Sequence, residues 1–247
     1  METNTLTENG VSTTKGLGEE MYIKCCLGAY RGKIYYQYDY RHLNGELFST
    51  LRPTLEQCRK ERDEWLKKST VAFSGHRTNR IAKFTTDRQR FFINVAHNTW
   101  AAIEEFCIKK GYHTFLSGMC EGFDLIAAEE VLNLKKEYPH IHLKCVLPFK
   151  GQAERYTQAD KRRYDTILAQ ADEVVTLQDG YTEGCFLRRN DYLLENSAFL
   201  MVYYDAVAVG GTFYTLKRAV EQKKKFANVR TLPLVLSRPR EPISAKL

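Results

Sequence analysis

Apolar and polar residues follow two different spacings along this chain, and the spacing changes near residue 69. Beyond that point, short apolar runs typical of strands buried on both faces alternate with longer segments whose apolar residues recur every three or four positions. The runs predict strands at residues 70–74, 113–117, 141–148, 172–177, 198–204 and 230–236. The segments between them predict helices at residues 87–110, 122–137, 158–170, 187–195 and 212–224. This alternation predicts an α/β fold with a doubly wound, mainly parallel sheet covered by helices on both faces.

The residues before this alternation have a pattern of their own. Residues 1–20 are rich in Thr, Gly, Asn and Glu, so we expect them to be disordered. Residues 21–27 and 33–40 are aromatic-rich and flank Gly28-Ala-Tyr-Arg-Gly32, which predicts a β-hairpin. Thr54-Leu-Glu-Gln57 has the spacing of a capping box and predicts a helix that ends near residue 68.

These patterns divide the chain into four parts. A disordered N-terminus (1–20) precedes a small α+β module made of a hairpin and a helix (21–68). A larger domain (69–237) and a tail (238–247) follow. A module this small is near the size at which a core needs outside support. We therefore expect it to pack on the larger domain or on a partner.

Tyrosines of the small module allow two interpretations. Tyr35, Tyr36, Tyr38 and Tyr40 are clustered in its second predicted strand. Exposed tyrosines with basic neighbours would stack the bases of single-stranded DNA. Alternatively, the tyrosines at every second position simply face the module's helix.

Composition narrows the class of protein. The chain of 247 residues is 43% hydrophobic, which is ample for a core, and it lacks an apolar run of roughly 18 residues, the length of a membrane span. Its seven cysteines are scattered and form no C-x-x-C pair, as expected for reduced thiols and not for a zinc site. We therefore expect a cytoplasmic protein with no secretory signal, membrane partner, metal or cofactor.

The net charge of +7 is compatible with nucleic acid or a phosphorylated ligand. Part of the basic excess lies between residues 77 and 90, beside a candidate ligand site. A solvated basic face would explain the same charge.

A turn with two glycines separates a predicted strand from a predicted helix at residues 114–129. Such a turn presents backbone N–H groups at the positive end of the helix dipole, where a phosphate is stabilised. The spacing Gly118-x-x-x-Gly122 has neither the Lys-Ser/Thr ending of a Walker loop nor the pattern G-x-G-x-x-G. Neither a P-loop ATPase nor an ordinary dinucleotide dehydrogenase is therefore indicated. An ordinary strand-to-helix turn has the same spacing, so other strand ends must support a ligand site.

Polar residues and glycines gather at four predicted strand ends. Because a doubly wound sheet binds ligands at the carboxyl ends of its strands, these residues are expected to meet at one site. The candidate ligand-binding residues are Ser74, Gly75, His76, Arg77, Ser117, Gly118, Gly122, Asp124, Pro148, Arg189, Asn190, Gly210, Gly211 and Thr212.

Several of these residue types suit a phosphate. The guanidinium of Arg77 can make a bidentate contact, and Gly75 permits close approach of the backbone. Gly210-Gly211-Thr212 opens a predicted helix and offers further N–H donors. His76 is either an acid or base or an ordinary hydrogen-bonded loop residue. Arg189 either reaches the ligand or belongs to the surface.

Three carboxylates near the glycine turn are candidate catalytic acids or bases: Asp124, Glu121 and Glu129. Asp124 lies at the helix start, where it complements the dipole but would repel a phosphate. Hydrogen bonding to ribose hydroxyls or bracing of the turn suits it better. Capping and surface roles are the alternatives for all three.

These motifs, in this order and spacing, resemble the YpsA-like branch of the SLOG superfamily, which also contains DNA-processing protein A (Smf) and the LOG phosphoribohydrolases. The resemblance covers about residues 69–237 and implies a Rossmann-like fold with a pocket for a nucleotide or nucleotide derivative at these loops. LOG enzymes carry a Pro-Gly-Gly-x-Gly-Thr-x-x-Glu motif with a catalytic glutamate. Residues 117–129 do not match that motif, which weakens the hydrolase interpretation. Relatives often self-associate, so a homodimer is expected.

The small module is similar to an uncharacterised family encoded on mobile elements of Bacteroides-type bacteria. The resemblance rests on Tyr36-Gln-Tyr-Asp-Tyr40-Arg41-His42, Gly45-Glu-Leu-Phe-Ser49 and Pro53-Thr-Leu-Glu56. It implies a mobile genetic element as the context and names no activity.

Three functions are consistent with these residues. The leading hypothesis is a sensor-like protein that binds a nucleotide or nucleotide derivative. The alternatives are an enzyme that hydrolyses the N-glycosidic bond of a nucleotide, and single-stranded DNA binding as in DNA-processing protein A. Whether the ligand is turned over is left open by the sequence.

Overall fold

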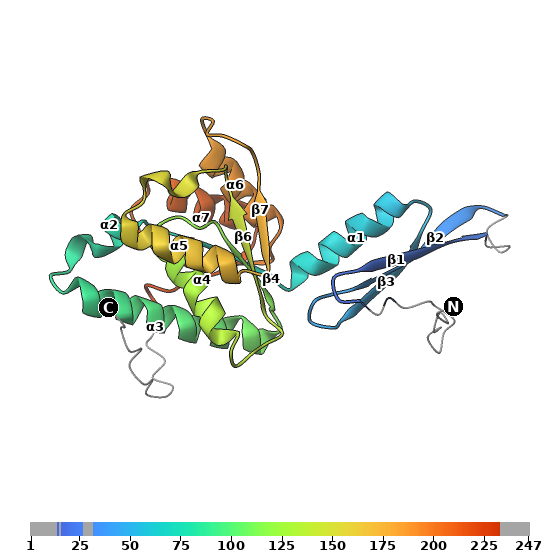
Figure 1. Cartoon of the computed structure of the whole chain (residues 1–247), viewed down its shortest axis with the longest axis horizontal. Coiled ribbons are helices and arrows are strands. Elements are labelled where there is room, and N and C mark those ends of the chain that lie inside the picture. Colours follow the sequence, from blue (N-terminus) through green and yellow to red (C-terminus); the bar gives the residue numbers. More distant parts are fainter. Residues whose placement is uncertain (1–13, 15, 27–31, 233–247) are drawn as a thin grey trace.

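The computed structural model describes residues 14, 16–26 and 32–232. They form two parts that lie side by side, a three-stranded sheet with one helix and a six-stranded sheet with helices around it (Figure 1). The disorder expected for residues 1–13 and the tail expected at residues 238–247 lie outside the described residues. Glu20, which was expected to be disordered, is the first residue of a strand.

The six strands of the larger sheet run parallel, in the order β7-β6-β5-β4-β8-β9. From β4 the chain adds strands outward on one side, then returns to add β8 and β9 on the other. The direction of winding therefore reverses between β4 and β8, and such a reversal is where doubly wound sheets bind ligands. The strands are β4 (Thr70–Gly75), β5 (Thr114–Ser117), β6 (His142–Leu147), β7 (Glu173–Thr176), β8 (Phe199–Tyr203) and β9 (Lys225–Asn228).

Helices cover both faces of this sheet, as the alternating pattern predicts. One face carries α3 (Arg88–Phe106), α4 (Phe123–Leu134) and α5 (Gln158–Gln170), and the other carries α6 (Cys185–Glu195) and α7 (Gly211–Glu221) (Figure 1). Shorter helical segments are α2 (Thr78–Ile81) and the 3-10 turns η2 (Ala82–Phe84), η3 (Ile108–Lys110) and η4 (Gln152–Arg155).

Successive side chains of the central strand enter two separate cores. Val71 and Phe73 pack beneath α3, α4 and α5, whereas Ala72 between them packs against α6 and α7. Phe73 also stacks on Phe115 of β5, with ring centroids 5.9 Å apart. Because both faces are buried, the strand is a continuous apolar run in the sequence.

The N-terminal module has the predicted hairpin and helix, and one strand that was not predicted. Strands β1 (Glu20–Cys26), β2 (Ile34–Arg41) and β3 (Leu47–Arg52) pair antiparallel in that order, and α1 (Leu55–Lys68) packs on them. Thr54 caps α1, since its side chain accepts a hydrogen bond from the Gln57 N–H at 3.2 Å. β3 has only six residues of mixed polarity, which gave it no clear strand pattern.

The tyrosines of β2 favour the interpretation in which alternate side chains face the helix. Tyr38 is fully buried, and its hydroxyl lies 2.9 Å from both Glu20 and Arg62 of α1. The guanidinium of Arg62 also lies over the ring of Tyr40, 5.3 Å from its centroid. These two rings are therefore engaged within the module and do not form an open platform for stacked bases.

The last strand was predicted in the wrong place. β9 is at Lys225–Asn228, whereas residues 230–232 form a turn and residues 233–236 lie outside the described residues. β9 is an edge strand with an exposed Phe226 and Lys225, so it lacks the apolar run that buried strands show. The sequence pattern predicted the strand instead at residues 230–236, which are more apolar.

Within the described part of the chain, no helix combines the length and the hydropathy needed to cross a bilayer.

Candidate functional site

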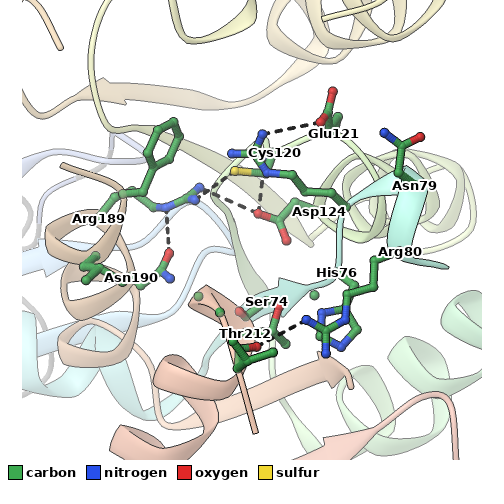
Figure 2. Close-up of a pocket in the computed structure, with 17 residues that line it drawn as sticks. Ser74, His76, Asn79, Arg80, Cys120, Glu121, Asp124, Arg189, Asn190 and Thr212 are labelled. Carbon is green, nitrogen blue, oxygen red and sulfur yellow. Dashed lines mark hydrogen bonds and ion pairs between the residues drawn. The ribbon is translucent and has the colours of Figure 1, made fainter. Parts of the chain in front are cut away.

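A cavity of about 470 Å³ opens at the carboxyl ends of β4 and β8, where the winding of the sheet reverses (Figure 2). Loops after both strands, the start of α6 and the start of α7 contribute to its walls. The lining residues are Ser74, Gly75, His76, Arg77, Asn79, Arg80, Cys120, Glu121, Asp124, Phe186, Leu187, Arg189, Asn190, Val209, Gly210, Gly211 and Thr212.

The start of α7 presents backbone donors to this cavity. Gly210 precedes the helix with φ of +88°, a conformation that favours glycine, and Gly211 is its first residue. Thr212 lies beneath, buried. N–H groups of a first helical turn have no acceptor within their own helix, and the dipole makes that end positive. This end of α7 is therefore suited to an anion.

The start of α4, where the glycine turn predicted an anion site, is instead closed by the protein. The Phe123 N–H donates to the His76 carbonyl oxygen at 3.1 Å. Gly122 has φ of +99°, and a Cβ there would lie 2.5 Å from that same oxygen. A Cβ on Gly75 would lie 2.3 Å from the Cβ of Phe123. These glycines let α4 approach the end of β4, and the first N–H group of the helix is already bonded to the protein.

A buried pair of opposite charges, Arg189 of α6 and Asp124 of α4, forms the floor of the cavity. The Arg189 Nη1 atom lies 3.7 Å from Asp124 Oδ2, and Arg189 Nη2 lies 3.1 Å from the Sγ atom of Cys120. The Cys120 N–H also donates to Asp124 Oδ2 at 3.4 Å. Asn190 accepts a hydrogen bond from Arg189 Nε at 3.0 Å. The floor of the cavity therefore carries one charged side chain from α4, Asp124, and one from α6, Arg189.

In the described part of the chain, two atoms of this ion pair lack a hydrogen-bond partner. Arg189 Nη1 and Asp124 Oδ1 are buried and make no hydrogen bond within the described residues. Burial raises the pKa of Asp124 above its usual value, and the nearby Arg189 charge offsets part of that rise. A donor and an acceptor therefore remain unsatisfied side by side, which is uncommon for buried polar groups.

A second charged group joins the loops after β4 and β8. Asp205 accepts hydrogen bonds from the Nε and Nη2 atoms of Arg80, both at 2.8 Å, and its Oδ1 lies 2.9 Å from His76 Nε2. Hydrogen bonding to Arg80 holds the pKa of Asp205 well below its usual range. Burial and the Arg80 charge lower the pKa of His76, so its imidazole is neutral at pH 7. This group positions Arg80 on the cavity wall.

Arg77 is the most exposed of the three arginines that line the cavity. Its side chain is 53% exposed, and Nη1 lies 3.4 Å from Glu121 Oε1. The guanidinium also lies 5.6 Å from the ring centroid of Phe186. Such an exposed ion pair contributes little to stability, so Arg77 can exchange Glu121 for a ligand at small cost.

The cavity brings together most of the predicted site residues but not all. Ser74, Gly75, His76, Arg77, Asp124, Arg189, Asn190, Gly210, Gly211, Thr212 and the catalytic candidate Glu121 line it, whereas Ser117, Gly118, Gly122, Pro148 and Glu129 do not. The Ser117 hydroxyl donates to the Asp124 carbonyl at 3.0 Å and so braces the turn. Glu129 accepts two hydrogen bonds of 2.7 Å from Arg163 of α5, outside the cavity.

Several lining residues were not predicted from the sequence. Asn79 and Arg80 follow Arg77 directly in α2, so extending the first strand end by one helical turn would have included them. Val209 precedes the glycine pair and could have been found in the same way. Cys120, Phe186 and Leu187 carry no such signal. In the portion of the chain that the structure covers, no group of three or more His, Cys, Asp or Glu side chains is arranged so that it could hold a metal ion.

Comparison with protein families gives two matches. The model named YpsA, described as the YspA SLOG family, matches residues 71–233. A domain of unknown function (DUF3873, with the description "B. Theta Gene description") matches residues 4–70.

Curated relatives are similar over the same larger domain. A UPF0398 protein of Bacillus velezensis is 29% identical over 157 residues, which covers 62% of this chain and 85% of that protein. A UPF0398 protein of Halalkalibacterium halodurans is 35% identical over 120 residues, or 48% of this chain and 64% of that protein. One from Bacillus cereus is 30% identical over 154 residues, or 57% of this chain and 81% of that protein.

Among solved structures, DNA processing protein A (DprA) from Streptococcus pneumoniae aligns with a TM-score of 0.44 and 19% identity. The alignment covers 66% of this chain and 50% of that chain.

Proposed function

Because the chain belongs to the YspA SLOG family, we propose that it binds a nucleotide or nucleotide derivative in the cavity between β4 and β8. The proposal assigns a sensor-like role, in which binding and not turnover is the function. It rests on the chemistry of the cavity, because the names of the relatives state no ligand.

One observation carries the proposal: the N-terminal end of α7 and the two arginines that follow β4, Arg77 and Arg80, border one cavity at the reversal of the sheet. Helix N-termini and guanidinium groups are the two commonest ways to hold a phosphate. Their convergence at a sheet reversal is the usual site for phosphorylated ligands in this fold class.

Arg80 and Arg77 differ in how firmly the protein holds their guanidinium groups before a phosphate binds. Asp205 fixes Arg80 through two hydrogen bonds, so this guanidinium loses little freedom when a ligand arrives. Arg77 is exposed and only loosely paired with Glu121. We assign Arg80 the role of a fixed cation in the cavity wall. We assign Arg77 the role of a cation that moves onto the ligand when it binds.

The floor of the cavity suits the sugar end of a nucleotide. Among the described residues, Nη1 of Arg189 is a donor and Oδ1 of Asp124 an acceptor without a hydrogen bond, and the two side chains are neighbours. A ribose hydroxyl is both a donor and an acceptor, so it matches this combination, whereas a phosphate would be repelled by Asp124. This arrangement orients the ligand with its phosphate toward α7.

Native mass spectrometry of the full chain tests the proposal, with AMP, ADP, NAD, ADP-ribose, cyclic nucleotides and a short single-stranded DNA as probes. We expect an adduct with at least one small nucleotide that is lost in an Arg77→Ala variant. Arg162→Ala, an exposed arginine of α5, is the matched control and should keep the adduct. Binding of DNA alone, or of no probe, would overturn the proposal.

One observation favours a second function, hydrolysis of an N-glycosidic bond. Burial raises the pKa of Asp124 at the cavity floor, and a carboxyl with a raised pKa can act as a general acid toward the leaving base. Release of free base from any nucleotide over hours, abolished by Asp124→Asn, would establish this activity. Without base release from the whole panel, binding remains the function.

A further inference from the structure

Three histidines meet where the N-terminal module contacts the larger domain. His42 follows β2, His113 precedes β5, and His142 is the first residue of β6. The Nε2 atom of His42 lies 3.3 Å from Nδ1 of His113, and the ring centroids of His42 and His142 are 5.8 Å apart. Only 4% of His42 and 5% of His113 are exposed. We call these three side chains the histidine cluster.

The cluster lies at the amino ends of the strands, at the opposite edge of the sheet from the cavity between β4 and β8. In this cluster, an aromatic ring of the N-terminal module packs against rings of the larger domain. Trp65 of α1 also packs edge-on against the ring of His42, with centroids 6.0 Å apart. Aromatic rings from both parts of the chain therefore pack together at this contact.

Few counterions are left to balance a charge on this cluster. Asp172 Oδ1 lies 3.5 Å from His142 Nδ1, but Lys135 and the Leu143 N–H already bond to that carboxylate. Glu46 lies 3.6 Å from His113 Nε2, but its side chain is 58% exposed. Both ring nitrogens of His142 and Nε2 of His113 are buried without a hydrogen bond to any described residue.

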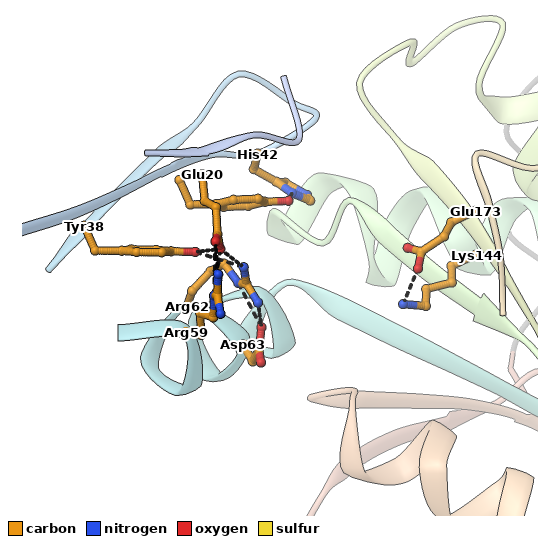
Figure 3. A network of polar contacts seen from close by, with 9 residues as sticks. Glu20, Tyr38, His42, Arg59, Arg62, Asp63, Lys144 and Glu173 are labelled. Carbon is orange, nitrogen blue, oxygen red and sulfur yellow. Dashed lines mark hydrogen bonds and ion pairs between the residues drawn. The ribbon is translucent and has the colours of Figure 1, made fainter. Parts of the chain in front are cut away.

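Other charged groups around the cluster are already paired with one another. Figure 3 shows Arg62 with Asp63 on the module side and Lys144 with Glu173 on the domain side, at 2.7 and 2.8 Å. The titratable and charged groups that face the cluster are Tyr40 and Glu46 of the module sheet, Arg62, Asp63 and Lys67 of α1, Lys135 after α4, His140 and Lys144 around β6, and Asp172 and Glu173 at β7.

The contact between the two parts is also incompletely filled. A cavity of about 270 Å³ lies between them, lined from the module by Tyr40, His42 and Lys67 and from the domain by Thr114 and His142, among others. An interface with a cavity has lost part of its dispersion contacts. Packing at this contact therefore contributes less to the docking free energy than a filled interface would.

We propose that the histidine cluster is a proton-sensitive latch that holds the N-terminal module on the larger domain at neutral pH and releases it in acid. Burial is the largest cause that lowers the pKa of all three imidazoles, and together with His113 and His142 it lowers that of His42 to about 4. Glu46 offsets part of the change in the pKa of His113, and Asp172 offsets part of that of His142. When the module is released and the three side chains reach solvent on their own parts of the chain, they regain an ordinary pKa of about 6.5.

The direction of the effect follows from proton binding. Below pH 6.5 the released form binds more protons than the docked form, so acid favours release. Docking is at full strength above about pH 7 and weakens as the pH falls from about 6.5 toward 4. For His42 alone, the change in pKa corresponds to a docking equilibrium constant that is roughly 30-fold smaller at pH 5.0 than at pH 7.5.

Nitrogen-15 relaxation of the full chain measures docking, because a docked module tumbles with the domain and a released one tumbles faster. We expect a single correlation time at pH 7.5 and a shorter one for residues 20–68 as the pH approaches 5.0. Amide shifts of the six-stranded sheet should stay native, which separates release from global unfolding.

Two variants identify the proton acceptor. His42→Gln should keep the module docked at pH 5.0, with a pH dependence reduced roughly 30-fold. His97→Gln on α3, outside the cluster, is the matched control and should behave as the wild type. A wild type that tumbles as one body from pH 7.5 to 5.0, or equal effects of the two variants, would overturn the proposal.

If His42→Gln is already released or misfolded at pH 7.5, imidazole C2–H exchange in the wild type decides, since it reports the protonation of each histidine separately. The latch is supported if the pH midpoint of His42 titration lies well below 6.5 while the module is docked and rises once the module tumbles freely. A midpoint near 6.5 under docked conditions removes it.

Discussion

Gly118 and Arg189 compete for one small volume at the cavity floor, since a Cβ atom at position 118 would lie 1.4 Å from Nη1 of Arg189. The guanidinium can reach Asp124 and Cys120 only because residue 118 has no side chain. Gly118 therefore shapes the cavity indirectly, by making room for a buried cation that itself lines it.

Gly118→Ala should lower the free energy of unfolding by about 1–3 kcal/mol, because Arg189 or the turn must move to admit the methyl group. The measurement is denaturant unfolding of both variants and the wild type. Gly180→Ala is the matched control, because a Cβ there meets no atom within 4 Å. It should change stability by no more than about 0.5 kcal/mol. Equal effects of the two substitutions would contradict this account of Gly118.

Arg77→Ala should weaken binding of a phosphorylated ligand by about 1.5–3 kcal/mol, through loss of a charge-assisted hydrogen bond. Stability should hardly change, since the side chain is exposed and its pairing with Glu121 is weak. Isothermal titration calorimetry with a nucleotide found by native mass spectrometry measures the loss. Unchanged affinity, or an equal loss in Arg162→Ala, would remove Arg77 from the site.

Gly211→Ala separates stability from binding at the start of α7. A Cβ there would lie 3.7 Å from Asn190 Nδ2, an ordinary contact, and alanine is a better helix former than glycine. We expect unchanged or slightly higher thermal stability and roughly tenfold weaker binding of a nucleotide phosphate, a loss of about 1.4 kcal/mol. Retained affinity would show that the phosphate does not approach this helix end.

Asp205→Asn should destabilise the protein by about 1–3 kcal/mol at pH 7, because it removes the charge that pairs with Arg80. The pKa of Asp205 is lowered in the folded state, so its contribution is complete above the unfolded pKa and is lost as the pH falls through the folded one. The gap between wild type and variant should therefore narrow below about pH 4. Asp165→Asn, at an exposed position of α5, is the control and should show no such gap.

Sequence spacing alone predicted most of the fold, because strand and helix periods depend on near neighbours in the chain. The central strands were found since they are buried on both faces, as at Val71 to Phe73. The sequence did not predict β3 and misplaced β9, because short, half-exposed edge strands contain no apolar run. Site residues next to strand and helix ends, such as Arg77 and Gly211, were predicted for the same local reason.

Tertiary structure alone decided how those residues are used. Glycines that border a cavity and glycines that admit a neighbouring element look identical in a sequence, so only packing separated Gly211 from Gly122. The pairing of Arg80 with Asp205 joins residues 125 positions apart. His42 and His113 are 71 positions apart. Contacts at such separations depend on the winding of the sheet and the docking of the module, which no local period encodes.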